Sequence, residues 1–356
     1  MNICFFISDH GFGHIMRNLS VIVELLEREN RVVIVCGKKH IEIAGEYVKA
    51  ECRNRHAEFI TVVNHTDAGL VVKPGTLVLD RERTGMEVAS FVSQFPERIE
   101  FACALFEQYD IDCAVVDIVP WALAAAKRMN IPSFLMASFT WIEQYEGYVK
   151  DHDLDVLKEA FQSADHILYY NLVNEPTLKL LGKGLEAGYV CRPFHEDRVA
   201  EIKKVHNRPI VFLSLGASNS GLDFTVDTSG LPYDFITTGA IKLRGDHVTC
   251  LAPSTPNTQD YVMAADFCIA KAGWSTVSEM MIAGVKFALL NRPDVPEDTM
   301  IIRQLENMNA AVGIDVEMLK DISAVMRMLE EAHLHHRKYD NNYKGVADFI
   351  VGFRNV

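Results

Sequence analysis

Short apolar runs alternate with longer amphipathic stretches along the first half of the chain. Roughly residues 14–29, 86–109 and 121–129 repeat apolar side chains at the spacing of a helix face. The apolar runs, each of strand length, occupy residues 2–7, 31–36, 58–63, 113–117, 133–137 and 166–171. Such runs are typical of strands buried on both faces, and repeated alternation with helices predicts a parallel sheet covered on both sides.

The alternation stops and then begins again in the second half. Residues 176–208 are rich in Gly, Pro and charge without a clear period, so we place a domain linker near 191–208. A helix is expected at 272–284, and strands are expected at 209–216, 234–239, 247–253, 266–271 and 286–291. The pattern predicts an α/β protein with two Rossmann-like, doubly wound domains, at 1–200 and 207–340.

Composition narrows the function classes. The 356 residues carry a formal net charge of -13, which disfavours nucleic acid and anionic membrane surfaces as partners. None of the 8 cysteines forms a C-x-x-C pair, and several lie in apolar runs, so reduced buried thiols are expected. The first residues lack the pattern of a signal peptide, and no apolar run approaches the length of a membrane span. We expect a cytoplasmic enzyme that is not inserted in a membrane.

Residues 8–18 contain the first candidate site. Gly11 and Gly13 let the backbone approach a ligand, and the helix that follows presents free N–H groups. His14 then begins that helix, where an imidazole of near-neutral pKa can act as a general base. A tight turn with a locally packed histidine explains the same residues about as well.

Asp117 ends a predicted strand, at the edge of the sheet where parallel strands converge on a ligand. A carboxylate there can fix the tautomer of His14 and stabilise its protonated form. The alternative is an acid that caps the helix after it.

Residues 270–279 repeat the order strand, glycine, helix. Gly273, Ser275 and Thr276 suit a diphosphate held by N–H groups and hydroxyls, and Glu279 suits two ribose hydroxyls. A capping box is the competing interpretation. In the loop at 291–304, Glu297 and Asp298 can bind sugar hydroxyls, or the loop is simply solvated.

Two further features have ordinary alternatives. Trp141 forms an aromatic stripe with Tyr145 and Tyr148, which either lines an acceptor site or packs in the core. His333, His335 and His336 lack a carboxylate or cysteine at ligand spacing, so no metal site is predicted.

The order of these segments resembles the GT-B glycosyltransferases. Gly11, Phe12, Gly13, His14 and Arg17 match a G-x-G-H-x-x-R motif, and the second domain matches K-x-G-x-x-T-x-x-E through Lys271, Gly273, Ser275, Thr276 and Glu279. The group that joins both motifs is similar to the N-acetylglucosaminyltransferase of peptidoglycan synthesis and to the glycosyltransferase-like part of plant arabinokinases. The resemblance covers nearly the whole chain, although about thirty motif residues carry it.

The resemblance implies two domains that face a cleft, with helix 341–356 packing back on the first. It implies inverting hexosyl transfer from a nucleotide-diphosphate sugar, UDP being expected, to a soluble acceptor, without metal or other cofactor. His14 would be the base and Asp117 its partner; Phe12, Arg17 and Trp141 would lie on the acceptor side. The donor would contact Gly13, Gly216, Ser218, Pro253, Lys271, Gly273, Ser275, Thr276, Glu279, Glu297 and Asp298.

Other activities of the same fold stay open. The loop at 216–221 is less basic and less glycine-dense than usual, so the motif does not specify the donor sugar. A nucleotide-sugar hydrolase would use the same histidine to activate water, and a non-catalytic nucleotide-binding module would keep the fold alone. A 2-epimerase is disfavoured because the carboxylates it needs are not found. A homodimer is compatible with all of these.

Overall fold

The computed structural model describes all residues except 75, 217–223, 240, 253–254, 336 and 354–356. The chain divides into two compact units. Unit 1 comprises Met1–Val71, Asp80–Val190 and Asn342–Val356, and unit 2 comprises Val72–Leu79 and Cys191–Asn341. The chain thus passes into unit 2 at Cys191, at the start of the segment 191–208 where the sequence places a linker. Residues 72–79 also belong to unit 2, where Val72 and Leu79 form an antiparallel bridge.

Unit 1 is built on a parallel sheet of seven strands in the order β3-β2-β1-β4-β5-β6-β7. The order reverses direction between β1 and β4, which is the topological switch point of a doubly wound sheet, where ligands bind. The strands are β1 (Asn2–Ile7), β2 (Arg31–Cys36), β3 (Phe59–Val63), β4 (Cys113–Asp117), β5 (Ser133–Ala137), β6 (His166–Tyr170) and β7 (Leu185–Gly188).

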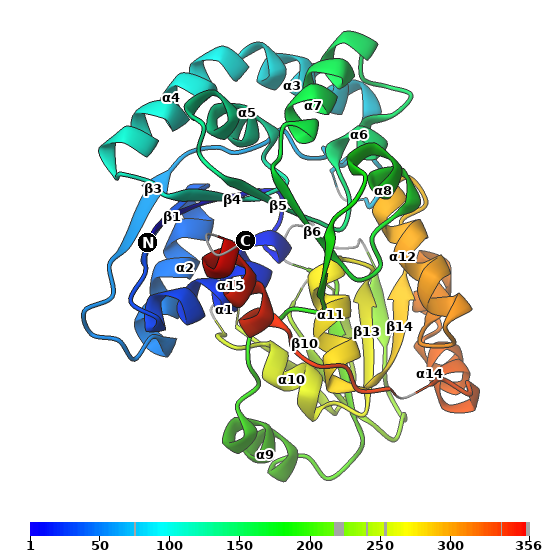
Figure 1. The fold of residues 1–356 in the computed structure, drawn as a ribbon. Helices are drawn as coiled ribbons and strands as arrows, with labels where there is room; N and C mark the ends of the chain where they lie inside the picture. Colours follow the sequence, from blue (N-terminus) through cyan, green and yellow to red (C-terminus); the bar gives the residue numbers. More distant parts are fainter. Residues whose placement is uncertain (75, 217–223, 240, 253–254, 336, 354–356) are drawn as a thin grey trace. The chain divides into compact units, whose positions relative to one another are not determined.

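Helices cover both faces of this sheet (Figure 1). One face carries α3 (Arg81–Ser93), α4 (Phe95–Gln108), α5 (Pro120–Met129) and α7 (Asp151–Gln162). The other carries α1 (Gly13–Glu27), α2 (Lys38–Glu51) and α15 (Tyr343–Gly352), and α15 packs on α1. Two short helices, α6 (Trp141–Tyr145) and α8 (Glu175–Leu181), complete the unit.

The expectation of one helix over 86–109 is wrong. The structure has two helices, α3 and α4, separated at Gln94. Pro96 lies in the first turn of α4, where its missing N–H costs nothing, whereas inside a continuous helix it would remove a hydrogen bond and clash with the preceding turn. Helices α2, α8 and α9 (Glu196–Lys204) were not anticipated, and α9 lies within the stretch interpreted as a linker.

Unit 2 contains a six-stranded sheet in the order β12-β10-β8-β13-β14-β15. Its switch point therefore lies between β8 and β13. The strands are β8 (Ile210–Ser214), β10 (Asp234–Thr237), β12 (Val248–Cys250), β13 (Phe267–Lys271), β14 (Lys286–Leu290) and β15 (Val312–Ile314), with β9 (Thr225–Asp227) and β11 (Lys242–Arg244) paired separately. The remaining helices are α10 (Gln259–Ala264), α11 (Trp274–Ala283), α12 (Pro296–Asn307), α13 (Val316–Lys320) and α14 (Ile322–Glu331).

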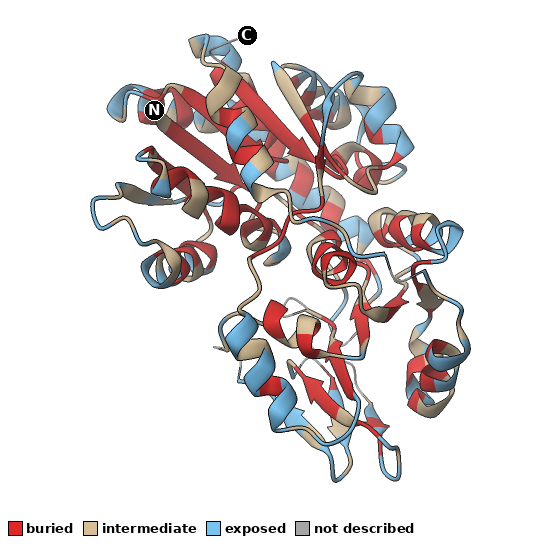
Figure 2. Ribbon diagram, turned by 60° about the horizontal axis from the view of Figure 1, so that its bottom comes forward, coloured by how far each residue is buried: buried red, intermediate tan, exposed pale blue. Residues whose placement is uncertain are grey.

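The predicted apolar runs form the interiors of the two units, as Figure 2 shows for the central strands. In β1, residues 3–7 are all fully buried, and β4 and β5 are buried throughout. Burial on both faces explains why these strands lack the alternation of a half-exposed strand. Within the described residues, no helix is both long and apolar enough to cross a membrane.

Candidate active site

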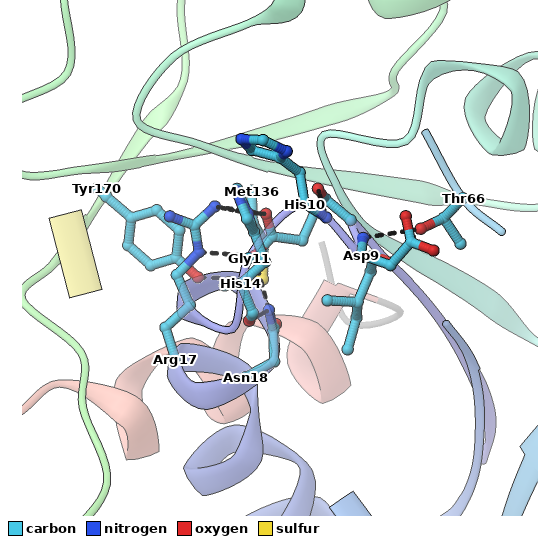
Figure 3. A network of polar contacts seen from close by, with 12 residues as sticks. Asp9, His10, Gly11, His14, Arg17, Asn18, Thr66, Met136 and Tyr170 are labelled. Carbon is cyan, nitrogen blue, oxygen red and sulfur yellow. Dashed lines mark hydrogen bonds and ion pairs between the residues drawn. The ribbon is translucent and has the colours of Figure 1, made fainter. Parts of the chain in front are cut away.

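His14 lies at the start of α1, directly after the glycine turn that follows β1 (Figure 3). Gly11 has a φ of 69°, a conformation that side chains disfavour, and it lets the chain turn sharply out of the sheet. Phe12 is the N-cap and makes no side-chain capping bond. The imidazole is buried and faces the switch point of unit 1.

Asp117 is the last residue of β4, the strand paired with β1 on the other side of the switch point. The N-cap of α5 is Val119, so the interpretation of Asp117 as a helix cap is wrong. Ile118, immediately after it, has a φ of 51°. A β-branched residue rarely adopts this conformation, which costs about 1–3 kcal/mol and is concentrated at functional sites.

A network of polar contacts holds the Asp117 carboxylate, and Figure 3 labels its partners His14, Arg17 and Asn18. Its Oδ1 lies 2.8 Å from His14 Nδ1 and accepts a further bond from Arg17 Nη2. Its Oδ2 accepts from Arg17 Nε at 2.7 Å and from Asn18 Nδ2 at 2.6 Å. The guanidinium also lies over the Tyr170 ring, 4.7 Å from its centre. Each oxygen of the buried carboxylate thus has two polar contacts.

The contacts determine which nitrogen of His14 carries the proton. Arg17 Nη2 lies 2.9 Å from His14 Nδ1, but a guanidinium has no acceptor and is already satisfied by Asp117. We therefore assign the proton to Nδ1, which donates to Asp117, and this leaves Nε2 as the basic nitrogen. The assignment follows from the hydrogen-bond partners.

Charge and burial set the protonation of the pair. Burial and the nearby Arg17 charge lower the pKa of His14, while Asp117 offsets part of that effect. Burial alone would raise the pKa of Asp117, but Arg17 and His14 hold it well below its usual range. The result is an ionised aspartate beside a neutral imidazole at neutral pH, which is the state a general base requires.

The residues expected on the acceptor side differ in their surroundings. Arg17 is only 2% exposed and is committed to Asp117. Phe12 stacks on His40, whose Nε2 lies 2.8 Å from the Gly11 carbonyl. Trp141 is buried, stacks on Tyr145 and meets His10 edge to face.

In unit 2, the glycine turn after β8 and the end of β13 meet at the switch point. Gly216 has a φ of 79°, and a Cβ placed on it would lie 2.9 Å from Cε of Lys271. Glycine therefore permits both the turn and the close approach of the lysine. Burial and the charge of Arg292 lower the pKa of Lys271 to about 8, although Asp298 and Glu297 act in the opposite direction. A cation of this kind is suited to a phosphate.

Helix α11 begins at Trp274 with Gly273 as its N-cap and has no side-chain capping bond. Ser275 and Thr276 are thus inside the first turn, and the capping-box interpretation is wrong. A helix start of this type presents N–H groups and a positive dipole to an anion.

Glu279 lies one turn further along α11 and is paired. Its Oε1 accepts from Arg192 Nη2 at 3.1 Å, and the same nitrogen donates to Thr258 at 3.2 Å. Burial raises the pKa of Glu279, and the Arg192 charge opposes that rise.

The two acids expected in a loop at 291–304 lie instead in the first turn of α12, which begins at Pro296, and they have different environments. Asp298 is fully buried and is held by two bonds from Arg292, at 2.6 and 2.7 Å. Its carboxylate is therefore occupied within the protein, whereas Glu297 is half-buried in the first turn of α12. Ser218 and Pro253 lie outside the described residues. No group of three or more potential metal-ligating side chains occurs in the part of the chain that the structure describes.

Three site residues were not identified from the sequence. Asn18 is four positions after His14 on α1, a spacing that places both on one helix face and was a usable signal. Asp67 follows β3 at the carboxyl edge of the sheet, which is also a detectable position. Arg192 pairs with a residue 87 positions away, and nothing local to it indicates that contact.

No sequence model of a protein family matches the chain. L-arabinokinase of Arabidopsis thaliana is 23% identical over 316 residues, which are 85% of this chain but 29% of that protein. The chain therefore spans less than a third of the length of this relative.

Solved structures match over the whole chain. CalG4, the calicheamicin glycosyltransferase, has a TM-score of 0.67 at 14% identity, with 99% of this chain and 98% of that chain covered. The chain has the GT-B fold. A second GT-B structure, Arabidopsis thaliana UGT89C1 with UDP-L-rhamnose, has a TM-score of 0.58 at 14% identity and covers 100% and 99% of the two chains. The same enzyme with quercetin has a TM-score of 0.60, with the same identity and coverage.

Proposed function

We propose that the protein is a metal-independent, inverting glycosyltransferase that moves a hexosyl group from a nucleoside-diphosphate sugar to an acceptor hydroxyl. The observation that carries the proposal is the His14–Asp117 pair, supported by Arg17, at the switch point of a GT-B unit. A buried imidazole with one nitrogen fixed by a carboxylate is the arrangement of an activated base.

Unit 2 supplies the groups that a nucleoside diphosphate needs. The start of α11, whose N-cap is Gly273, and the Lys271 ammonium at the Gly216 turn offer a positive helix dipole and a positive charge for the two phosphates. These groups offset the anionic charge without a metal ion. Glu279, which Arg192 holds through one oxygen, would accept bonds from ribose hydroxyls. The complex of UGT89C1 with UDP-L-rhamnose supports UDP as the first nucleotide to test.

In the proposed reaction, His14 Nε2 removes the proton of the acceptor hydroxyl as its oxygen bonds to the anomeric carbon. The bond between that carbon and the diphosphate oxygen breaks, and the nucleoside diphosphate leaves with the electron pair. Attack from the face opposite the leaving group inverts the anomeric centre. Asp117 stabilises the imidazolium that forms, and Arg17 limits that stabilisation so that the base returns to its neutral form.

The first test is a thermal-shift screen of nucleoside diphosphates. A ligand at 100 times its Kd stabilises the folded protein by about 2.7 kcal/mol, so UDP should give a clear rise in Tm. Turnover of the matching UDP-sugar is then measured for wild type, His14→Ala and His56→Ala, where His56 is an exposed control.

We expect His14→Ala to keep its UDP-induced shift and to lose turnover by about a hundredfold or more, whereas His56→Ala should match wild type. Turnover should also survive EDTA. Unimpaired turnover in His14→Ala, or no shift with any nucleoside diphosphate, would overturn the proposal. Rapid release of free sugar without an acceptor would instead identify a hydrolase.

A further inference from the structure

Among the buried side chains of unit 1 whose polar atoms have no hydrogen-bond partner in the described part of the chain, four come from the loops and the short helix at the carboxyl edge of the sheet. They are both carboxylate oxygens of Asp67, the Ser138 hydroxyl, the Trp141 indole nitrogen and both amide atoms of Gln144. These side chains, which we call the unpartnered cluster, belong to residues that are 3%, 3%, 2% and 2% exposed. Ser8 is near enough to Asp67 to favour its charged form, but it does not meet hydrogen-bond geometry.

The cluster lies along the carboxyl edge of the unit 1 sheet, where the candidate base is also found. Asp67 is in the loop after β3, Ser138 directly follows β5, and Trp141 and Gln144 are three residues apart on α6, hence on one face. A chain of ring contacts leads from His14 to Phe139 at 5.9 Å and from Phe139 to Trp141 at 5.5 Å.

Further contacts connect the other end of the cluster. Trp141 stacks on Tyr145 at 5.3 Å, and the Tyr145 hydroxyl donates to the Gly69 carbonyl, two residues from Asp67. Trp141 also meets His10, whose Nδ1 accepts from the Leu70 N–H. Figure 3 shows His10 on the same turn as His14. The cluster and the base are thus parts of one layer at this edge.

Unpartnered buried polar atoms require an explanation, because proteins pair nearly all of them. Each one costs free energy in the folded protein unless a ligand or a water molecule supplies the missing partner. The atoms here include donors and acceptors: the indole N–H donates, the amide and hydroxyl do both, and a carboxyl accepts or, when protonated, also donates. Hydroxyl groups complement this set.

The charge near Asp67 is balanced, which favours a neutral ligand. Asp9 is paired with His65 at 2.8 Å, and Arg98 donates to the Asn64 side chain at 3.2 Å beside them. The Asp9–His65 pair therefore does not leave an excess of negative charge for a cationic ligand. Burial and the neighbouring Asp9 raise the pKa of Asp67 to about 8, so its carboxyl is mostly protonated at neutral pH.

We propose that the unpartnered cluster binds the hydroxyl groups of a compact, neutral, polyhydroxylated acceptor, such as a free monosaccharide or a cyclitol. The inference rests on the proposed glycosyl transfer and specifies its acceptor class. The ring of Trp141 provides an apolar face beside the polar atoms, which suits the mixed surface of a sugar. A flat polyphenol such as quercetin lacks the density of hydroxyl groups that this set of atoms requires.

The test measures acceptor use and acceptor binding by the full chain. D-xylose, D-glucose and myo-inositol are compared with quercetin, using the UDP-sugar that the donor screen selects. Saturation-transfer NMR in the presence of UDP measures binding without requiring turnover. Trp141→Phe removes the indole N–H, Gln144→Met removes both amide atoms, and Asp67→Asn replaces one carboxyl oxygen by an amide nitrogen. The control Asp165→Asn alters a carboxylate already satisfied by Ser133 at the opposite edge of the same sheet.

We expect at least one polyol to bind and to be glycosylated, and quercetin to be inert. Trp141→Phe and Gln144→Met should raise the acceptor KM by about tenfold or more, with a smaller change in kcat, and Asp165→Asn should not change KM. Transfer to quercetin alone, or an unchanged acceptor KM in all three cluster variants, would overturn the inference. Water molecules would then be the hydrogen-bond partners of these atoms. If wild type binds no nucleoside diphosphate and consumes no nucleotide sugar, the proposed function itself fails.

Discussion

Replacement of Arg17 by methionine separates the electrostatic role of this residue from a role in acceptor binding. Arg17 is 2% exposed and donates two bonds to Asp117, so truncation leaves a buried carboxylate whose remaining partners among the described residues are His14 and Asn18. Removal of one member of a buried ion pair costs about 3–5 kcal/mol of folding free energy. Arg17→Lys keeps the positive charge but not the two-pronged geometry, so it should lose less folding free energy than Arg17→Met.

The same change should raise the pKa of His14. Two positive charges about 4 Å apart repel by about 4 kcal/mol at an effective dielectric of about 20, and Arg17 Nη2 lies 2.9 Å from His14 Nδ1 in wild type. Loss of this repulsion, with Asp117 left uncompensated, favours the imidazolium. Allowing for water entry after truncation, we expect the acid limb of the pH profile to move up by more than about one pH unit.

The assay is the pH dependence of kcat/KM together with NMR titration of the His14 ring, which needs no substrate. In wild type, where the pKa of His14 is lowered, activity should persist to a lower pH than an ordinary histidine allows. Arg28→Met removes a partly exposed cation from the end of the same helix and should leave the limb unchanged. An acid limb that stays in place or moves down in Arg17→Met would refute the reasoning, because it would show that Arg17 does not repel the charged imidazole.

Three further changes test other parts of the structure. Arg192→Met removes the partner of Glu279, so UDP affinity measured by calorimetry should fall about 10- to 100-fold, and the preference for UDP over 2′-deoxy-UDP should become smaller. Arg198 pairs with Asp260 instead, so the control Arg198→Met should change neither the affinity nor the preference. Asp67→Asn should be more stable than wild type near pH 8. The raised pKa of Asp67 contributes stability to the wild type at about pH 4, and this contribution is lost at about 1.4 kcal/mol per pH unit as the pH approaches about 8. The same pH dependence of the free energy of unfolding in urea for both proteins would contradict this prediction. Gly69→Ala should lower the free energy of unfolding by about 2 kcal/mol, since φ is 61° and the new Cβ would lie 2.3 Å from His10 Nδ1, whereas Gly45→Ala, with nothing within 4 Å, should be neutral or stabilising.

The sequence was sufficient to predict the two α/β units because buried parallel strands have a simple signature. The runs at 2–7, 31–36 and 113–117 are short, apolar and followed by glycine or helix signals, and they became β1, β2 and β4. The strand-end positions of His14 and Asp117 followed from the same pattern, since the carboxyl ends of neighbouring strands must meet. Contacts of this kind are fixed by topology.

What the sequence did not reveal depends on long-range contacts or on weak local signals. The bond between Arg192 and Glu279 joins residues far apart in the chain, and the helix α9 lies in a charged segment with little apolar periodicity. The division of the chain at Cys191 is likewise set by packing. Cys191 is hydrogen-bonded to Asn341, and both belong to unit 2, whereas Asn342 is hydrogen-bonded to Tyr189, and both belong to unit 1. Composition alone does not predict these hydrogen bonds.

The structure explains the spacing of the residues in the first motif. His14, Arg17 and Asn18 are separated by three and four positions, which places all three on one face of α1 toward a single carboxylate. An aspartate buried beside a histidine raises the pKa of that histidine, and the imidazolium form cannot accept a proton. The arginine compensates the carboxylate, so that Asp117 orients the imidazole without fully charging it. On this argument the arginine is required by the base, and a histidine in this position without it would function only at higher pH.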